Sequence, residues 1–262
     1  MIMKKLSIVL IIASIAFVFN SCKKAEEDND TQSAVDNSIC EGEFMSIPPL
    51  INSIGIDEEG LSTKGGGCPS KSLSQYKKFP TTLTIDYGTG CQDSIENKFR
   101  KGKIKALFSG PWDTTTASVT ISFENYYVNN INFDGVIVIS KKGMALTTTV
   151  TDAKCKTSDF EIKWSATRTI SWIDGFKTLK DKTDDVFTYA GNSSGTNRDG
   201  KKYTSEIITT LVKRNSCQWI ESGIVKIVPE GKAERSVNYG DGTCDDKATL
   251  TINGNTFNFS LK

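Results

Sequence analysis

The segment 159–172, DFEIKWSATRTISW, alternates between apolar and polar residues along most of its length. One face carries the apolar side chains, which are those of Phe160, Ile162, Trp164, Ala166, Ile170 and Trp172. Arg168 is the one charged residue that interrupts this face. Successive side chains of a β-strand point to opposite sides of the sheet, so this period of two predicts an antiparallel strand with one buried face.

The same period recurs through most of the chain after residue 80. It is clearest at 83–87, 104–108, 117–127 and 248–252. Turn-forming sequences rich in glycine and asparagine separate the runs, and the INGN sequence at 252–255 lies between two strand-like runs, as in a hairpin. Residues 80–262 are therefore predicted to form an all-β domain of about ten to twelve strands.

Short turns place consecutive strands side by side, which predicts an antiparallel meander. A sheet of that size with one apolar face must cover that face, either by closing into a barrel or by folding over as a sandwich. The sequence leaves both closures open.

Six cysteines follow residue 39, in addition to Cys22. The segments 68–91 and 217–244 each begin and end with cysteine, pass a proline, and close through a β-rich stretch with Tyr-Gly and a second glycine. This similarity predicts two disulfides of an oxidising compartment, Cys68–Cys91 and Cys217–Cys244. It leaves Cys40 and Cys155 as a third pair or as free thiols, and it also allows two related halves of the fold.

The N-terminus has the parts of an export signal. Lys4 and Lys5 precede a run from Leu6 to Phe19 that contains no charged residue, and Ser21 precedes Cys22. The run is shorter than the roughly 20 residues of a membrane-spanning helix. The pattern resembles a bacterial lipoprotein signal, which implies removal of residues 1–21 and attachment of fatty acid, such as palmitate, to Cys22. The alternative is a plain signal peptide followed by an unrelated cysteine.

Residues 22–39 are rich in charge and contain no aromatic residue. This composition cannot bury enough apolar surface to fold, so it predicts a flexible acidic tether. Lysines followed by an acidic cluster resemble the surface-export signal of Bacteroidetes lipoproteins, which implies display on the outer face of the outer membrane. The alternative is a lipoprotein that faces the periplasm. Residues 40–79 are predicted to be an irregular entry segment with at most one short helical turn.

The charge balance and the lack of histidine exclude several function classes. The chain has 32 basic and 31 acidic residues and no histidine. The sequence shows no stripe of basic residues that would predict nucleic-acid binding. Catalytic triads and metal sites that need an imidazole are excluded. The chain also contains no Cys-x-x-Cys pair of the kind that predicts a zinc site. We therefore expect no metal, no cofactor and no enzyme activity.

Several phrases in residues 80–262 resemble a group of secreted lipoproteins of Bacteroidetes. They include TLTIDYGTGCQD, RKGKIKALFSGPW, SGTNRDGKKYTSEI and the C-terminal YGDGTCDDKATLTINGNTFNFSL. The resemblance implies a surface lipoprotein with a β-rich body. It implies no activity and no catalytic residue, because none is known for the group.

Four aromatic residues are candidate exposed rings, namely Trp112, Tyr126, Tyr203 and Trp219. Exposed rings beside polar groups can stack on sugars, and the alternative is that they cover sheet edges. A second candidate is the turn with Asp241, Asp245 and Asp246, which could hold calcium. It lacks the alternating oxygen ligands of a calcium loop, which favours a turn stabilised by aspartate.

Three functions remain open on this basis. The first is a lipid-anchored envelope protein with a non-catalytic binding or adhesive role toward a glycan or another envelope protein. The second is a carrier that holds an apolar ligand inside a β-barrel. The third is a hydrolase that depends on a pair of carboxylates.

Overall fold

The structure is a computed structural model that describes residues 28–56, 68–93, 96–112, 117–143, 145–178 and 181–261. Cys22 and the predicted signal peptide lie outside the described residues. Two helices come first, α1 (Gln32–Phe44) and α2 (Ile47–Ile56). Fourteen strands follow: β1 (Ser70–Leu73), β2 (Thr81–Asp86), β3 (Cys91–Gln92), β4 (Phe99–Phe108), β5 (Ser118–Val128), β6 (Ile131–Lys142), β7 (Ala145–Lys156), β8 (Glu161–Asp174), β9 (Val186–Thr196), β10 (Lys202–Arg214), β11 (Ser222–Pro229), β12 (Arg235–Asp241), β13 (Lys247–Ile252) and β14 (Asn255–Ser260).

The strands form one antiparallel sheet, which confirms the predicted all-β meander. Apart from the two-residue β3, which pairs with β4, each strand lies beside its neighbours in sequence. Within the described residues, β1 pairs only with β2 and β14 only with β13, so the sheet is not closed into a barrel. Of the two closures that the sequence left open, closure into a barrel by strand pairing is therefore not found among the described strands.

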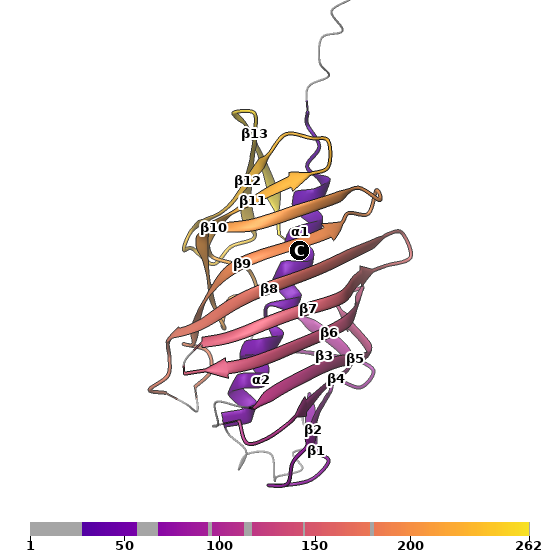
Figure 1. The fold of residues 1–262 in the computed structure, drawn as a ribbon, viewed down its shortest axis with the longest axis vertical. Helices are drawn as coiled ribbons and strands as arrows, with labels where there is room; N and C mark the ends of the chain where they lie inside the picture. Colours follow the sequence, from indigo (N-terminus) through magenta and orange to yellow (C-terminus); the bar gives the residue numbers. More distant parts are fainter. Residues whose placement is uncertain are drawn as a thin grey trace, which may run out of the picture.

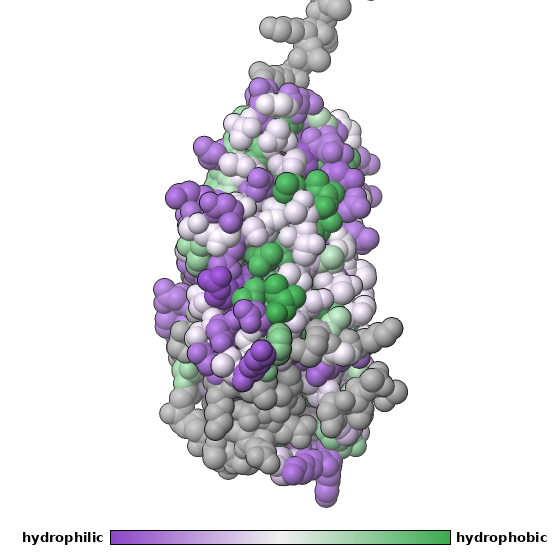
Figure 2. Space-filling view, turned by 90° about the vertical axis from the view of Figure 1, so that its left-hand side faces the viewer, coloured by the Kyte–Doolittle hydropathy of each residue, from purple (hydrophilic) through white to green (hydrophobic). Residues whose placement is uncertain are grey.

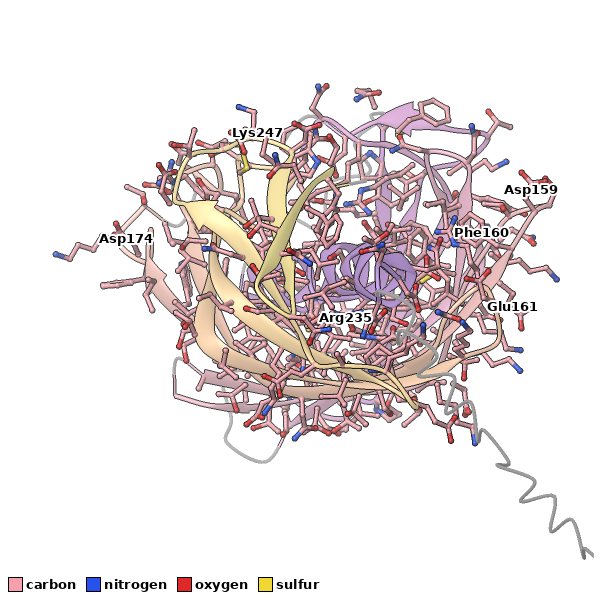
Figure 3. The ribbon with its side chains drawn as sticks, turned by 90° about the horizontal axis from the view of Figure 1, so that it is seen from above. Asp159, Phe160, Glu161, Asp174, Arg235 and Lys247 are labelled. Atoms are coloured by element: carbon pink, nitrogen blue, oxygen red, sulfur yellow. A yellow bond between two sulfur atoms is a disulfide. The ribbon has the colours of Figure 1, made fainter. Side chains whose placement is uncertain are left out.

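The sheet instead curls around the two helices. Figure 1 views the sheet from its outer face, with α1 and α2 following one another behind the strands along the long axis. Seen from above, the helices occupy the centre and strands surround them on most sides (Figure 3). The interior of the fold is therefore helix packed against sheet.

Bulges in the strands provide part of this curvature. The pairing of β4 with β5 shifts register between Lys101 and Lys103. At that point Gly102 has φ +81°, and a Cβ there would lie 2.0 Å from the carbonyl oxygen of Asn125. Asn125 itself has φ +47°. A bulge bends its strand and increases the local twist, which helps a long sheet to wrap.

The helices correct two predictions from the sequence. Residues 22–39 were predicted to be a tether, yet α1 begins at Gln32 and most of its side chains are buried. Residues 40–79 were predicted to be irregular, yet α2 covers Ile47–Ile56. The prolines at 48 and 49 fit the first turn of α2, where their missing N–H groups cost no helical hydrogen bond.

An aromatic cluster fixes the junction between the helices and the sheet. Phe44, at the end of α1, stacks on Trp164 of β8 with ring centroids 5.7 Å apart. Phe123 and Phe133 contact the ring of Phe44 edge-on. Ile47 and Ile51 of α2 continue the core and are fully buried. Rings of this size dominate core energetics, so Phe44 anchors α1 to the sheet.

Candidate functional site

Helix α1 is buried although it has no continuous apolar face, because its polar side chains meet polar partners on the sheet. The best defined pair is Glu41 with Arg168, the charged residue on the apolar face of β8. Arg168 Nε and Nη2 donate to the two carboxylate oxygens of Glu41 at 2.8 and 2.6 Å. Both side chains are completely buried. A two-point pair of this kind fixes both position and orientation.

Neutral side chains of α1 also meet polar partners on the sheet, although the buried Nδ2 of Asn37 has no hydrogen-bond partner. The Asn37 carbonyl oxygen accepts hydrogen bonds from the indole of Trp164 at 3.0 Å and from the hydroxyl of Ser193 at 3.1 Å. Ser38 shares a hydrogen bond of 3.0 Å with Tyr239. Buried polar groups need such partners, so these contacts fix the register of α1 within the sheet.

A second buried cluster joins α1, the β3–β4 turn and β10. Glu43 accepts hydrogen bonds from Arg100 and, at 2.7 Å, from the hydroxyl of Tyr126. Glu96 pairs with Arg100 and, at 2.5 Å, with Lys213. Burial opposes ionisation of Glu96, but Lys213, Lys98 and Arg100 together hold its pKa well below the usual range. A carboxyl in this state does not serve as a general acid, so this cluster gives no support to a hydrolase.

These interior contacts also bear on the carrier function. Inside the curve of the sheet, where a carrier would hold an apolar ligand, the structure places α1 and α2. Their side chains Ala34, Cys40, Phe44, Ile47 and Ile51 are fully buried there. A ligand in that space would have to displace the helices.

A hollow lies on the outer face of β7–β11. It consists of two adjoining hollows of about 900 Å³ and about 670 Å³. They have four outward-facing residues in common, Ser165, Ser194, Thr204 and Val228. We call the combined hollow the outer groove; it lies on the face of the sheet that Figure 1 views.

Small serine and threonine side chains line much of this region. Beneath the groove, Gly195 lies opposite Trp164 and Tyr203 on the inner face of the sheet, where a Cβ would come within 2.5 Å of the Tyr203 ring and 2.7 Å of the Lys163 carbonyl oxygen. The pairing of β7 with β8 shifts register between Val150 and Ala153. Such a bulge re-aims the neighbouring side chains and bends the strand.

The larger hollow is rich in lysine. Four lysines line it, Lys154, Lys163, Lys202 and Lys232, against two acidic residues, Asp152 and Glu230. Lys163 is 64% exposed. At the other end of the groove the charges are balanced, because Lys226 and Glu206 form an ion pair of 2.8 Å. The groove therefore combines hydroxyl groups along its floor with a cluster of lysines at one end, two of which also lie near carboxylates outside the lining: Lys163 is 4.0 Å from Glu161 and Lys232 is 3.7 Å from Asp28.

This arrangement suits a polar ligand with negative charge. Serine and threonine hydroxyls both donate and accept hydrogen bonds, and lysine donates to anionic oxygens. The groove is not predictable from the sequence. The only signal in the sequence there is the serine and threonine at outward positions of β7–β10, which also suit an ordinary exposed sheet face.

The predicted aromatic platform is wrong for three of its four rings. Trp112, Tyr126 and Tyr203 are at most 3% exposed, and only Trp219 is partly exposed. The indole of Trp112 donates to Asn52 of α2 at 3.1 Å. Tyr126 was expected to point outward with Glu124, but the bulge around Asn125 inserts a residue and turns Tyr126 into the core. Tyr203 faces inward from β10. The four rings do not form one exposed surface.

The aspartate-rich turn at 241–246 also has a structural explanation. Asp241 accepts a hydrogen bond from the backbone N–H of Thr243, and Asp245 accepts one from Lys247. Among the described residues, no group of three or more histidine, cysteine, aspartate or glutamate side chains could hold a metal ion. Aspartate side chains that bind nearby backbone N–H groups are typical of turns.

The two predicted disulfides are both present. Cys68 is joined to Cys91, and Cys217 to Cys244. Cys40 and Cys155 are free and buried. The first disulfide joins the start of β1 to β3, and the second joins the β10–β11 and β12–β13 connections, so each fixes one end region of the sheet.

On the side of the molecule where β8 ends, the exposed apolar residues do not form one large continuous patch that could serve as a binding site. Figure 2 shows separate apolar patches on that side among polar side chains. Ile173 and Phe176, at the end of β8, are exposed by 50% and 42%. Scattered apolar side chains are normal for a protein surface, so the outer groove remains the best candidate.

A scan against protein-family models, a search of curated proteins and a search of solved structures each give no match for this chain. The resemblance to Bacteroidetes lipoproteins therefore stays a prediction. In the ranges that the structure describes, no helix is both long enough and apolar enough to cross a membrane.

Proposed function

We propose that this protein is a lipid-anchored protein of the cell envelope that binds an anionic glycan strand in the outer groove, without catalysis. The observation that carries the proposal is the groove itself, in which a floor of hydroxyl groups continues into an end lined by four lysines. Hydroxyls match the hydroxyls of a sugar chain, and the lysines match its carboxylate or sulfate groups.

The anchor is supported by the first residues of the chain. The charged start, the run without charges and the small residue before Cys22 match a lipoprotein signal. The proposed location of the protein is the outer membrane, with display at the cell surface. Because α1 begins at Gln32, only 32 − 22 = 10 positions after Cys22, the folded body would lie close to the lipid surface.

The groove lies near the point where the chain enters the fold. Lys232, at one end of the groove, is 3.7 Å from the carboxylate of Asp28, the first described residue. Arg235 holds the same carboxylate at 2.8 Å. An anchored protein would therefore hold this end of the groove toward the membrane, where envelope glycans are attached.

Recognition by hydroxyls and lysines differs from the aromatic stacking predicted from sequence. Exposed ion pairs weaken as salt rises, whereas stacking does not. We therefore expect affinity for a polyuronate to fall between low and high salt, and a neutral glucan to bind more weakly at every salt concentration.

Substitution of the groove lysines tests the proposal. Each of Lys154→Ala and Lys163→Ala should weaken polyuronate binding by about two- to five-fold, as expected for loss of one exposed ion pair. Isothermal titration calorimetry measures the change. Lys247→Ala is the matched control, because Lys247 is 81% exposed and lies outside the groove.

A bulky side chain provides a second test that does not depend on charge. Ser194→Trp should fill the centre of the groove and abolish measurable binding, because Ser194 borders both hollows. Thr120→Trp is the control on the outward face of β5, away from the groove. Equal affinity of the Ser194→Trp variant and the unmodified protein, or a polyuronate affinity no higher than that for the neutral glucan, would refute the proposal.

A further inference from the structure

Within the described residues, β14 leaves one edge of the sheet without a partner strand. It pairs with β13 alone, just as β1 at the other edge pairs with β2 alone among these residues. Figure 1 shows β13 and β1 at opposite ends of the long axis, so the two edges do not meet within one molecule. The outer side of β14, which we call the free edge, is therefore open to another chain.

The pairing of β14 with β13 shows which backbone groups face the free edge. The N–H of Leu261, directly after β14, donates to the carbonyl oxygen of Asp246 at 2.7 Å, and the pairing continues along both strands without a register shift. In an antiparallel pair, the backbone groups of successive residues point alternately toward the partner strand and away from it. The residues of β14 whose N–H and C=O groups point toward the free edge are therefore Thr256, Asn258 and Ser260.

β14 has none of the features that normally prevent sheet edges from pairing. Natural edge strands are protected by short length, charge, proline or a bulge. β1, at the other edge, is four residues long and contains Lys71. β14 is six residues long, its sequence NTFNFS contains neither a charge nor a proline, and no bulge interrupts it. The three residues that point toward the free edge are all exposed, so this edge can accept a further strand.

A second copy of β14 complements the free edge in one antiparallel register. When Asn258 lies opposite Asn258 of the second copy, Thr256 lies opposite Ser260, so the facing residues are those whose backbone groups point toward the free edge. Each such pair exchanges two hydrogen bonds. The same register places Phe257 of one copy beside Phe259 of the other, on the side of the sheet that faces the core, where both rings are half-buried. Aromatic pairs and hydroxyl pairs across strands stabilise an antiparallel sheet.

We propose that β14 is the interface of a twofold homodimer, in which the free edges of two copies pair and join their sheets. The partner is a second copy because the free edge complements itself, and a twofold axis at Asn258 repeats every facing pair. An interface of one strand from each copy is small, so we expect a weak dimer with a dissociation constant in the micromolar range. The outer groove lies on β7–β11, so this inference does not depend on the proposed function.

Charges placed at the twofold axis test both the dimer and its register. Asn258→Lys alone and Asn258→Asp alone each place like charges directly opposite one another, whereas a mixture of the two variants places opposite charges there. Each protein also carries Cys22→Ser, so that a lipid cannot drive association, and the protein with Cys22→Ser alone is the reference. Sedimentation velocity from micromolar to millimolar concentration should show a dimer for the reference protein. We expect about five- to ten-fold weaker association for each single variant, and recovery in the mixture.

The control adds the same charge away from the free edge. Thr120→Lys lies on the outward face of β5 and should dimerise like the reference protein. An Asn258→Lys variant that dimerises as strongly as the reference, or a mixture that associates no more strongly than its two components, would overturn the inference. A reference protein that stays monomeric at every concentration would also overturn it, and would leave the free edge for a strand of another protein.

Hydrogen exchange of the reference protein, followed by NMR, is a second test that needs no variant of β14. The amides of Thr256, Asn258 and Ser260 should exchange more slowly as the protein concentration rises, because they are hydrogen-bonded between strands only in the dimer. The amides of Phe257 and Phe259, which face β13 in each copy, should be protected at every concentration. A dimer that forms without this alternating change would show that the copies meet elsewhere, and would contradict the proposed interface.

Discussion

Arg168 and Glu41 show how single residues determine the position of α1. The sequence marks Arg168 as an exception on the apolar face of β8, and its partner lies 127 positions away in sequence. Removing two charges from water costs several kcal/mol, which only the pairing and its hydrogen bonds offset. The pair therefore selects one register of α1 more than it adds net stability.

Breaking this pair should be costly, whereas replacing it should not. Arg168→Met leaves the carboxylate of Glu41 buried without its partner, and we expect a loss of about 3 to 5 kcal/mol in the free energy of unfolding. The double variant Glu41→Leu with Arg168→Met removes both charges and should recover most of that loss. Urea unfolding followed by circular dichroism measures both.

An exposed ion pair provides the control for this experiment. Lys105 and Glu124 lie 2.5 Å apart, but their side chains are 44% and 46% exposed. Lys105→Ala should cost less than about 1 kcal/mol. A loss of similar size for Lys105→Ala and Arg168→Met would show that the buried pair has no special role.

At the scale of elements, the strands were predictable and the helices were not. Strand positions follow from side-chain alternation, which is local, and the two disulfides follow from a repeated local pattern. Helix α1 has no apolar stripe, so a composition such as that of residues 32–44 reads as solvated chain. Its polar residues are buried because partners such as Arg168, Trp164 and Tyr239 lie on strands that are distant in sequence.

Truncation distinguishes an interior helix from a tether. Starting the chain at Asp28 keeps α1 and the contacts of Asp28, and it should leave cooperative urea unfolding unchanged. Starting it at Ser46 removes α1, so that Arg168 loses Glu41, Trp164 loses Asn37 and Arg100 loses Glu43. We expect loss of the cooperative transition and binding of the dye ANS to exposed apolar surface. Equal unfolding curves for the two truncated chains would instead support the prediction that residues 22–39 are a flexible tether.

At the scale of the whole molecule, a meander of this length could cover its apolar face in several ways, and the sequence left the choice open. In the structure α1 and α2 cover the apolar face of the sheet, although their residues were predicted to be a tether and an irregular entry segment outside the β domain. The outer groove could not be predicted either, because its lining comes from five neighbouring strands whose relative placement the sequence does not give. Both features depend on how distant strands are placed by the curl of the sheet.

The proposed anchor makes the last prediction, because it decides where the groove can act. Cys22→Ser removes the sulfur atom through which the lipid would be attached. We expect the unmodified protein to incorporate radiolabelled palmitate and to partition into the detergent phase, whereas the variant does neither. The urea midpoint should not change, because α1 begins ten positions later, 32 − 22 = 10. A Cys22→Ser variant that still takes up palmitate, or still sediments with washed outer membranes, would contradict the proposed lipid anchor. The proposed binding in the outer groove would not be affected, because it is tested by its own binding measurements.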